Sequence, residues 1–262
     1  MGDKPYNSSK TRVQPCFEQL YRLDTSGRNW GEKLLRFGSR SSAALPQNLE
    51  LGPLKEPPHF EKSVPAPRPY LEWLVRNGSK LDRTALKGDL SQHTLDKRRA
   101  LIDGDPAVIR EALDILSRSP GSGENWAILE GSTQVDCVLA FENVTVYIEG
   151  KRKESHLTSS TTWYPHRSQV MRNLDCLYHS TDRPHNWYVL LVVEQGTPPE
   201  AQAPTLDTCG EEVAKALPHL AETGQLEEAW QHYLGFTTWQ AIQSAFDLPA
   251  FPDTVDEASA SI

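Results

Sequence analysis

The chain has 262 residues, of which 38% are hydrophobic and 24% are charged, and its formal net charge is −8. This composition suits a soluble globular protein rather than a disordered one, and no apolar run reaches the roughly 18 residues of a membrane-spanning helix. Residues 197–262 hold eleven acidic residues and the single base Lys215, so the rest of the chain is nearly neutral. The net charge therefore does not exclude a nucleic-acid partner.

The cysteines indicate a reducing environment. Cys16, Cys137, Cys176 and Cys209 lie far apart in the sequence and form no CxxC pair, which favours reduced thiols over a disulfide framework or a zinc ribbon. The first twenty residues lack the apolar core of a secretory signal. We therefore expect a cytoplasmic protein that does not associate with a membrane.

Residues 1–68 are expected to form an irregular N-terminal arm. One short helix is indicated at "NWGEKLLRFGSR", but "GPLKEPPHFEKSVPAPRP" contains too many prolines for regular structure. Two helices are predicted beyond it. "PYLEWLVRNGSKL" places its apolar residues on one side and ends at Asn77-Gly78. "DPAVIREALDILSRSPGSG" begins with Asp105 as a cap and ends at Pro120.

Strand patterns dominate the middle of the chain. "NWAILEG", "VDCVLAFE" and "VTVYIEGK" predict three strands, "WYPHRSQVMRNLDCLYHS" a helix, and "NWYVLLVVEQG" a buried strand. "CGEEVAKALPHLAET" and "LEEAWQHYLGFTTWQAIQSAF" then predict helices. We expect an α/β fold, a three-layer sandwich whose central mixed sheet of four to five strands is flanked by helices, with helical N- and C-terminal additions.

Three segments follow from this pattern: the arm at 1–68, an α/β core at 69–196, and an acidic helical extension at 197–262. The extension is expected either to pack on or beside the core or to bind another protein or a second copy of the chain. The sequence does not decide between these alternatives.

Three charged residues are predicted to meet at one end of a hairpin. Alternate side chains of a strand share a face, so Glu149 and Lys151 project the same way across Gly150. A turn near Glu142-Asn143 would pair the two strands with Asp136 opposite Glu149, because each acid lies six residues from the turn.

Two carboxylates this close repel one another unless a proton or a cation lies between them. Oxygen ligands favour a hard ion such as Mg²⁺, with Mn²⁺ as a substitute, and the carbonyl of Gly150 is a candidate third ligand. Lys151 beside the ion is placed to orient or deprotonate water, or to neutralise charge on a phosphate. These parts suit hydrolysis of a phosphodiester.

The spacing of Asp136 and Glu149-Gly150-Lys151 resembles the D…(D/E)xK motif of the restriction-endonuclease-like, or PD-(D/E)xK, nuclease superfamily. The resemblance covers residues 105–195, including the order helix, three strands, helix, strand. It implies a Mg²⁺-dependent nuclease, with DNA favoured as substrate. Val135 stands where the family motif has proline. Asp136, Glu149 and Lys151 would then be catalytic, with Asp136, Glu149, Gly150 and a further acid, Glu130, at the metal.

The resemblance extends to the helix after the lysine strand, where Gln169 and Arg172 are expected to contact the substrate backbone. The fourth acidic residue stays open, because Glu111 of the first helix is an alternative or an addition to Glu130. Charges at strand ends are commonly just solvated, and a nuclease-like fold that only binds nucleic acid or protein is the alternative function. His166, Cys176, His179 and His185 match no familiar zinc spacing and are interpreted as scattered residues.

Overall fold

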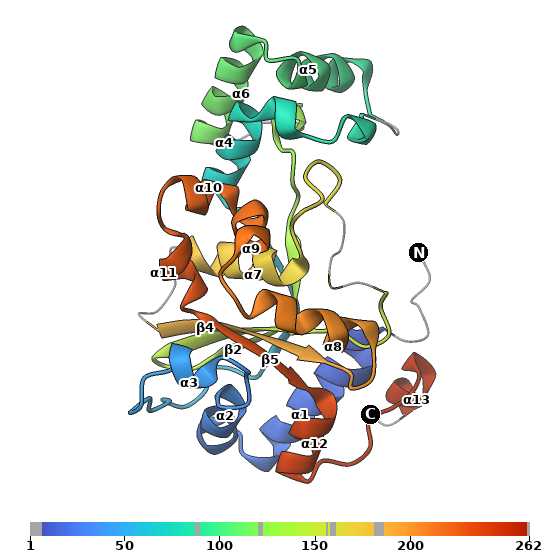
Figure 1. Ribbon diagram of the computed structural model, residues 1–262. Helices are drawn as coiled ribbons and strands as arrows, with labels where there is room; N and C mark the ends of the chain where they lie inside the picture. Colours follow the sequence, from blue (N-terminus) through green and yellow to red (C-terminus); the bar gives the residue numbers. More distant parts are fainter. Residues whose placement is uncertain are drawn as a thin grey trace.

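The computed structural model describes residues 7–86, 90–119, 123–155, 157, 161–180 and 186–260. A five-stranded sheet in the order β1-β2-β3-β4-β5 forms its centre (Figure 1). The strands are β1 (His59–Val64), β2 (Thr133–Ala140), β3 (Val144–Gly150), β4 (Asn186–Val193) and β5 (Tyr233–Thr238). The pairs β1–β2 and β2–β3 are antiparallel, whereas the pairs β3–β4 and β4–β5 are parallel. The sheet is therefore mixed, as predicted.

The β2–β3 hairpin fixes the register at the charged end. Cys137 pairs with Ile148 and Ala140 with Thr145, and the same register continued by one residue sets Asp136 opposite Glu149. The alternation of apolar residues specifies this pairing, because a slip by one residue would exchange the two faces of each strand. The predicted register of the hairpin is thus the observed one.

One face of the sheet is covered by helices from both ends of the chain (below the sheet in Figure 1). They are a π-helical turn η1 (Ser9–Val13), α1 (Gln14–Leu23), α2 (Arg28–Leu35), α3 (Ser41–Ala44) and α12 (Trp239–Phe246). Phe17 and Leu34 of these helices pack with Trp239 against Ile148 and Leu190 of the sheet. The segments before β1 and after β5 therefore contribute to one common core.

The opposite face carries α7 (Gln169–Tyr178) and a series of short helices (Figure 1). The short helices are α8 (Pro198–Gln202), η5 (Ala203–Leu206), α9 (Glu211–Ala216), α10 (Pro218–Glu222) and α11 (Leu226–Trp230). Val170 and Leu174 of α7 pack with Trp230 against Val189 and Leu191 of β4. Since β4 is buried on both faces, its continuous apolar sequence follows from its central position.

Three longer helices form a lobe beyond this layer, at the top of Figure 1. They are α4 (Arg68–Arg76), α5 (Gln92–Ile102) and α6 (Pro106–Arg118). The short turns η2 (Gly78–Lys80) and η3 (Arg83–Ala85) lie between α4 and α5, and η4 (Asn125–Ala127) follows α6. Tyr70, Leu101, Ile115 and Trp126 belong to the separate apolar cluster of this lobe. Asp105 caps α6 as predicted, accepting hydrogen bonds from the next backbone amides. A last helix, α13 (Val255–Ala260), follows at the C-terminal end.

The α/β class and the helix-flanked mixed sheet are as predicted, and they fit a three-layer sandwich. The predicted helices at α2, α4, α6, α7, α9 and α10 and the strand at β4 are also present. All four cysteines are free. Within the described ranges, none of the helices has both the length and the apolar character to cross a bilayer.

Three predicted elements differ from the structure. The stretch "NWAILEG" was expected to be a strand, but it forms η4 and buries Trp126 in the lobe. The proline-rich part of the expected irregular arm contains β1, a mostly exposed edge strand without apolar alternation. The helix expected across "LEEAWQHYLGFTTWQAIQSAF" is interrupted by β5. The sheet consequently extends beyond residues 69–196 at both ends, and the segment 197–262 is not wholly helical.

Candidate metal centre

Asp136, Glu149 and Lys151 come together at one end of the β2–β3 hairpin. The Nζ atom of Lys151 lies 2.8 Å from Oε1 of Glu149, and the backbone N–H of Gly150 donates to Oδ2 of Asp136 at 2.8 Å. Glu149 and Lys151 thus share a face across Gly150, and Asp136 reaches the same strand end. The three charges form one group.

The group is largely withdrawn from water. The Glu149 side chain is fully buried and that of Lys151 is 12% exposed, while Asp136 is half-buried. Burial and the neighbouring Glu149 carboxylate raise the pKa of Asp136 well above its usual range, and burial likewise raises the pKa of Glu149. Burial alone would lower the pKa of Lys151, but the charges of Glu149 and Asp136 raise it. Lys151 is therefore a cation paired with Glu149, in the field of a second carboxyl group.

The two carboxylate oxygens of Glu149 have different partners. Its Oε2 accepts a hydrogen bond from Nδ2 of Asn173 on α7 at 2.9 Å. Its Oε1 is buried and pairs with the Lys151 ammonium group at 2.8 Å. A hard cation would take this oxygen as a ligand if the ammonium group moved aside. The donor set and this oxygen fit a Mg²⁺ ion.

Backbone contacts hold Lys151 in place. Its N–H donates to Val192 O at 2.8 Å and its carbonyl accepts from Glu194 N at 3.1 Å. The same carbonyl accepts from the indole Nε1 of Trp239 at 3.1 Å. Neighbouring elements on both sides therefore fix the lysine backbone, which leaves its side chain as the adjustable part of the group.

Gly150 is required by close packing at the centre of the group. A Cβ atom here would lie 2.4 Å from Cγ2 of Val13 and 2.9 Å from the ring of Trp239. Overpacking of this kind costs about 1–3 kcal/mol, so we expect Gly150→Ala to lower the free energy of unfolding by that amount. Urea denaturation measures it. Gly131→Ala, where a Cβ meets nothing within 4 Å, is the control, and equal stability of the two variants would contradict the packing described here.

Glu130 lies with two arginines instead of with Asp136 and Glu149. Its Oε1 is 3.2 Å from Nε of Arg172 and 3.7 Å from Nη2 of Arg167. Glu130 and Arg172 line a cavity of about 350 Å³, together with Tyr70 and Trp163. Two guanidinium groups therefore neutralise the charge of Glu130, and its ion pairs are with them and not with the group at the hairpin end.

The remaining candidate residues make their contacts with other groups. Gln169 begins α7, and its Nε2 donates to the carbonyl of Gln134 at 2.6 Å. Arg172 donates to the carbonyls of Gly131 and Ser132 in addition to its contact with Glu130. Both side chains therefore support the segment leading into β2. Glu111 is on α6 in the helical lobe, where it forms an exposed ion pair with Lys97.

Asn173 is a polar contributor that the sequence did not single out. It is fully buried in the middle of α7 and bridges Glu149 to Oγ1 of Thr133, which lies 3.4 Å from its Oδ1. A buried amide requires hydrogen-bond partners. A polar residue on the apolar side of a predicted helix is the feature of the sequence that could have pointed to Asn173. Val13 and Trp239, which enclose Gly150, belong to segments more than eighty residues away in sequence.

Replacing Asp136 by asparagine is expected to stabilise the metal-free protein. A carboxyl group whose pKa is raised on folding lowers stability as pH rises above the ordinary value of 3.8. Asparagine keeps an acceptor for the Gly150 N–H and removes that charge. We expect the free energy of unfolding to rise by about 1–2 kcal/mol at pH 7 in EDTA, and this difference to vanish below about pH 4. Chemical denaturation across this pH range measures it, and a loss of stability at pH 7 would contradict the strained-carboxylate account.

Comparisons with protein-family models, with curated proteins and with solved structures found no match to this chain.

Proposed function

We propose that the protein hydrolyses phosphodiester bonds of nucleic acid, with DNA the favoured substrate, by means of a metal ion held by Asp136 and Glu149. The observation that carries the proposal is the contact of Lys151 with Glu149 at 2.8 Å, beside Asp136, at one end of a buried hairpin. Two carboxylates and a lysine at this spacing also support the resemblance to PD-(D/E)xK nucleases.

The proposed metal ligands are Asp136 and Oε1 of Glu149, which Lys151 would release to the ion, and Asn173 holds the other oxygen of Glu149 in position. When bound, Mg²⁺ would polarise the scissile phosphate and lower the pKa of a bound water. The Gly150 N–H keeps the Asp136 carboxylate directed toward the strand end. Both carboxylates lie on neighbouring antiparallel strands, and the register sets the two residues opposite one another.

Lys151 is proposed to act as a cation. Its raised pKa keeps the ammonium group protonated, which favours neutralisation of charge on the phosphate over removal of a proton from water. The fixed backbone of Lys151 limits the volume that its ammonium group can reach. Preorganised positive charge at the point where negative charge develops is a large contribution to catalysis in a water-poor site.

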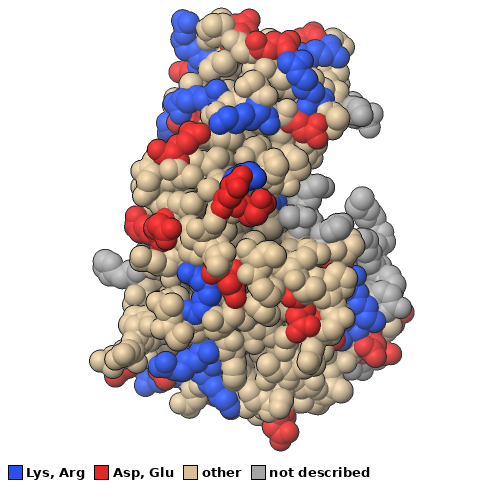
Figure 2. All heavy atoms as spheres, viewed as in Figure 1, with Lys and Arg blue, Asp and Glu red and all other residues tan. Residues whose placement is uncertain are grey.

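The surface adds little to the choice of substrate. On the face shown in Figure 2, basic and acidic side chains alternate over the helical lobe, where Arg83 pairs with Asp103 and Arg118 with Glu124. Arg172, at the cavity between lobe and core, remains our candidate for contact with the substrate backbone. The proposal therefore rests on the hairpin end and not on a basic surface.

The test is cleavage of labelled single- and double-stranded DNA and RNA by the purified chain. We expect cleavage with Mg²⁺ or Mn²⁺ and none with EDTA. Binding of nucleic acid, or of a protein partner, without metal-dependent cleavage of any of the four substrates would instead support the alternative of a nuclease-like fold that only binds.

A further inference from the structure

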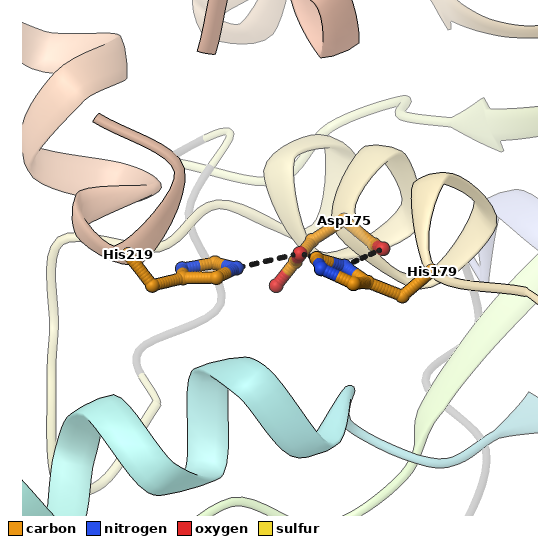
Figure 3. A group of neighbouring side chains, drawn as sticks. All are labelled: Asp175, His179 and His219. Atoms are coloured by element: carbon orange, nitrogen blue, oxygen red, sulfur yellow. Dashed lines mark hydrogen bonds and ion pairs between the residues drawn. The ribbon is translucent and has the colours of Figure 1, made fainter. Parts of the chain in front are cut away.

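Two histidines and an aspartate from separate elements meet beside α7, away from the hairpin end (Figure 3). Asp175 and His179 lie one turn apart on α7, and His219 comes from α10. Nδ1 of His179 and Nε2 of His219 each lie 2.9 Å from Oδ1 of Asp175. One donor atom from each of the three residues falls within 4.8 Å of the others.

We propose that Asp175, His179 and His219 bind a divalent transition-metal ion of the Zn²⁺ class, at a site separate from Asp136 and Glu149. Two imidazole nitrogens and one carboxylate oxygen are a donor set that zinc accepts, with water in the fourth position. Zinc bonds of about 2.0–2.1 Å at tetrahedral angles separate ligand atoms by about 3.4 Å. Contacts of 2.9 Å need only small side-chain rotations to reach this spacing.

The surroundings of Asp175 are suited to a metal ligand. Its carboxylate is fully buried, and its second oxygen, Oδ2, accepts a hydrogen bond from Nη1 of Arg167 at 2.9 Å. This contact orients the carboxylate and leaves Oδ1 directed at the two imidazoles. Partners outside the ligand set commonly fix metal ligands in this way.

Both histidine rings depend on one carboxylate oxygen. They share Oδ1 of Asp175, and Nδ1 of His179 also lies 3.1 Å from the Asp175 carbonyl. A metal ion would give each ring its own bond in place of the shared oxygen. The side chain of His179 is 19% exposed, so ion and water have access from its side.

A metal here would join two helices of one layer that are distant in the sequence. It would tie α7 to α10, and the His219 ring lies 5.3 Å from the Tyr70 ring of α4. The ion would therefore fix a ring that contacts the helical lobe. His219 is 40 residues beyond His179 in the chain, which explains why ligand spacing in the sequence did not indicate this site.

The experiment uses the full chain, stripped of metal with a chelator and titrated with Zn²⁺, with affinity read by competition with a zinc dye. We expect one tightly bound equivalent and a rise in the melting temperature. His179→Ala and His219→Gln should each weaken this binding at least about 100-fold. His93→Ala, which removes an exposed histidine of α5, and Glu149→Gln, which changes the other site, should leave it unchanged.

Circular dichroism checks that each variant is folded. His179 is partly exposed, so His179→Ala keeps the test valid if His219→Gln does not fold. Absence of a stoichiometric Zn²⁺ ion in the folded wild-type chain would overturn the proposal. So would a zinc affinity that His179→Ala leaves unchanged, or one that Glu149→Gln abolishes.

Discussion

Glu149→Gln is expected to lower the rate of Mg²⁺-dependent cleavage by about 10³-fold, the range seen when a key electrostatic group is removed from an active site. Glutamine keeps the shape of the side chain and can still contact Asn173. It removes the negative charge from Oε1, the buried oxygen that pairs with Lys151 and is proposed to bind the metal. The rate under single-turnover conditions, with saturating substrate and a series of Mg²⁺ concentrations, is the measurement.

Lys151→Met separates the role of the lysine from that of the metal. Methionine keeps an unbranched apolar stem but loses the charge beside Glu149, so we expect a lower cleavage rate with no weaker requirement for Mg²⁺. Glu142→Gln and Lys55→Ala are matched controls, because both residues are exposed at the far end of the hairpin. If Glu149→Gln cleaved as fast as Glu142→Gln, the assignment of the site would fail.

Arg167→Leu is expected to destabilise the fold by about 3–5 kcal/mol, the cost of removing one partner of a buried ion pair. The Arg167 guanidinium is fully buried between Asp175 and Glu130 and lies 3.6 Å from the centre of the Tyr70 ring. Its loss leaves the Asp175 carboxylate buried without its cation. Urea denaturation in EDTA measures the change in the free energy of unfolding without contribution from bound metal.

Arg76→Leu provides the exposed counterpart. Arg76 is 56% exposed and pairs with Glu72 on the surface of α4, so its removal should cost less than about 1 kcal/mol. Adding Asp175→Leu to Arg167→Leu should recover part of the lost stability, since both buried charges are then absent. A cost for Arg167→Leu no larger than that for Arg76→Leu would contradict the importance of this buried pair.

The group at the hairpin end could be predicted because the two strands that form it are adjacent in the sequence. Alternating apolar residues fix the register of β2 and β3, and the register alone sets Asp136 opposite Glu149. The same periodicity predicted α7 and the buried strand β4. Where one face of an element is buried against a neighbour, its pattern is visible in a single sequence.

The three elements that were predicted wrongly, β1, β5 and "NWAILEG", lack a distinctive apolar pattern. β1 is an exposed edge strand, so burial imposes little alternation on it, and its flanking prolines suggested a linker. β5 pairs irregularly with β4, with a register shift between Val189 and Leu191, and it is directly followed by α12. Its sequence therefore merged with a helical pattern. "NWAILEG" is apolar because Trp126 packs in the core of the helical lobe. Periodicity alone cannot distinguish a short buried turn of this kind from a buried strand.

The partners of the candidate residues could not be predicted, because they depend on long-range packing. Glu130 was placed at the metal by resemblance, yet its closest charged contacts are Arg172 and Arg167. Asn173 reaches Glu149 only because α7 lies across β3. The meeting of His219 with Asp175 likewise depends on how α10 folds back onto α7. Contacts of this kind need the tertiary structure.

The central claim is that Asp136 and Glu149 hold one metal ion, and the most direct test is anomalous diffraction from crystals of the chain soaked in Mn²⁺. The account predicts a Mn²⁺ peak about 2.2 Å from an Asp136 carboxylate oxygen and from Oε1 of Glu149, with the Lys151 ammonium group moved away from that oxygen. A Mn²⁺ peak only at other residues, with Lys151 still in contact with Glu149 at a Mn²⁺ concentration that supports cleavage, would contradict it.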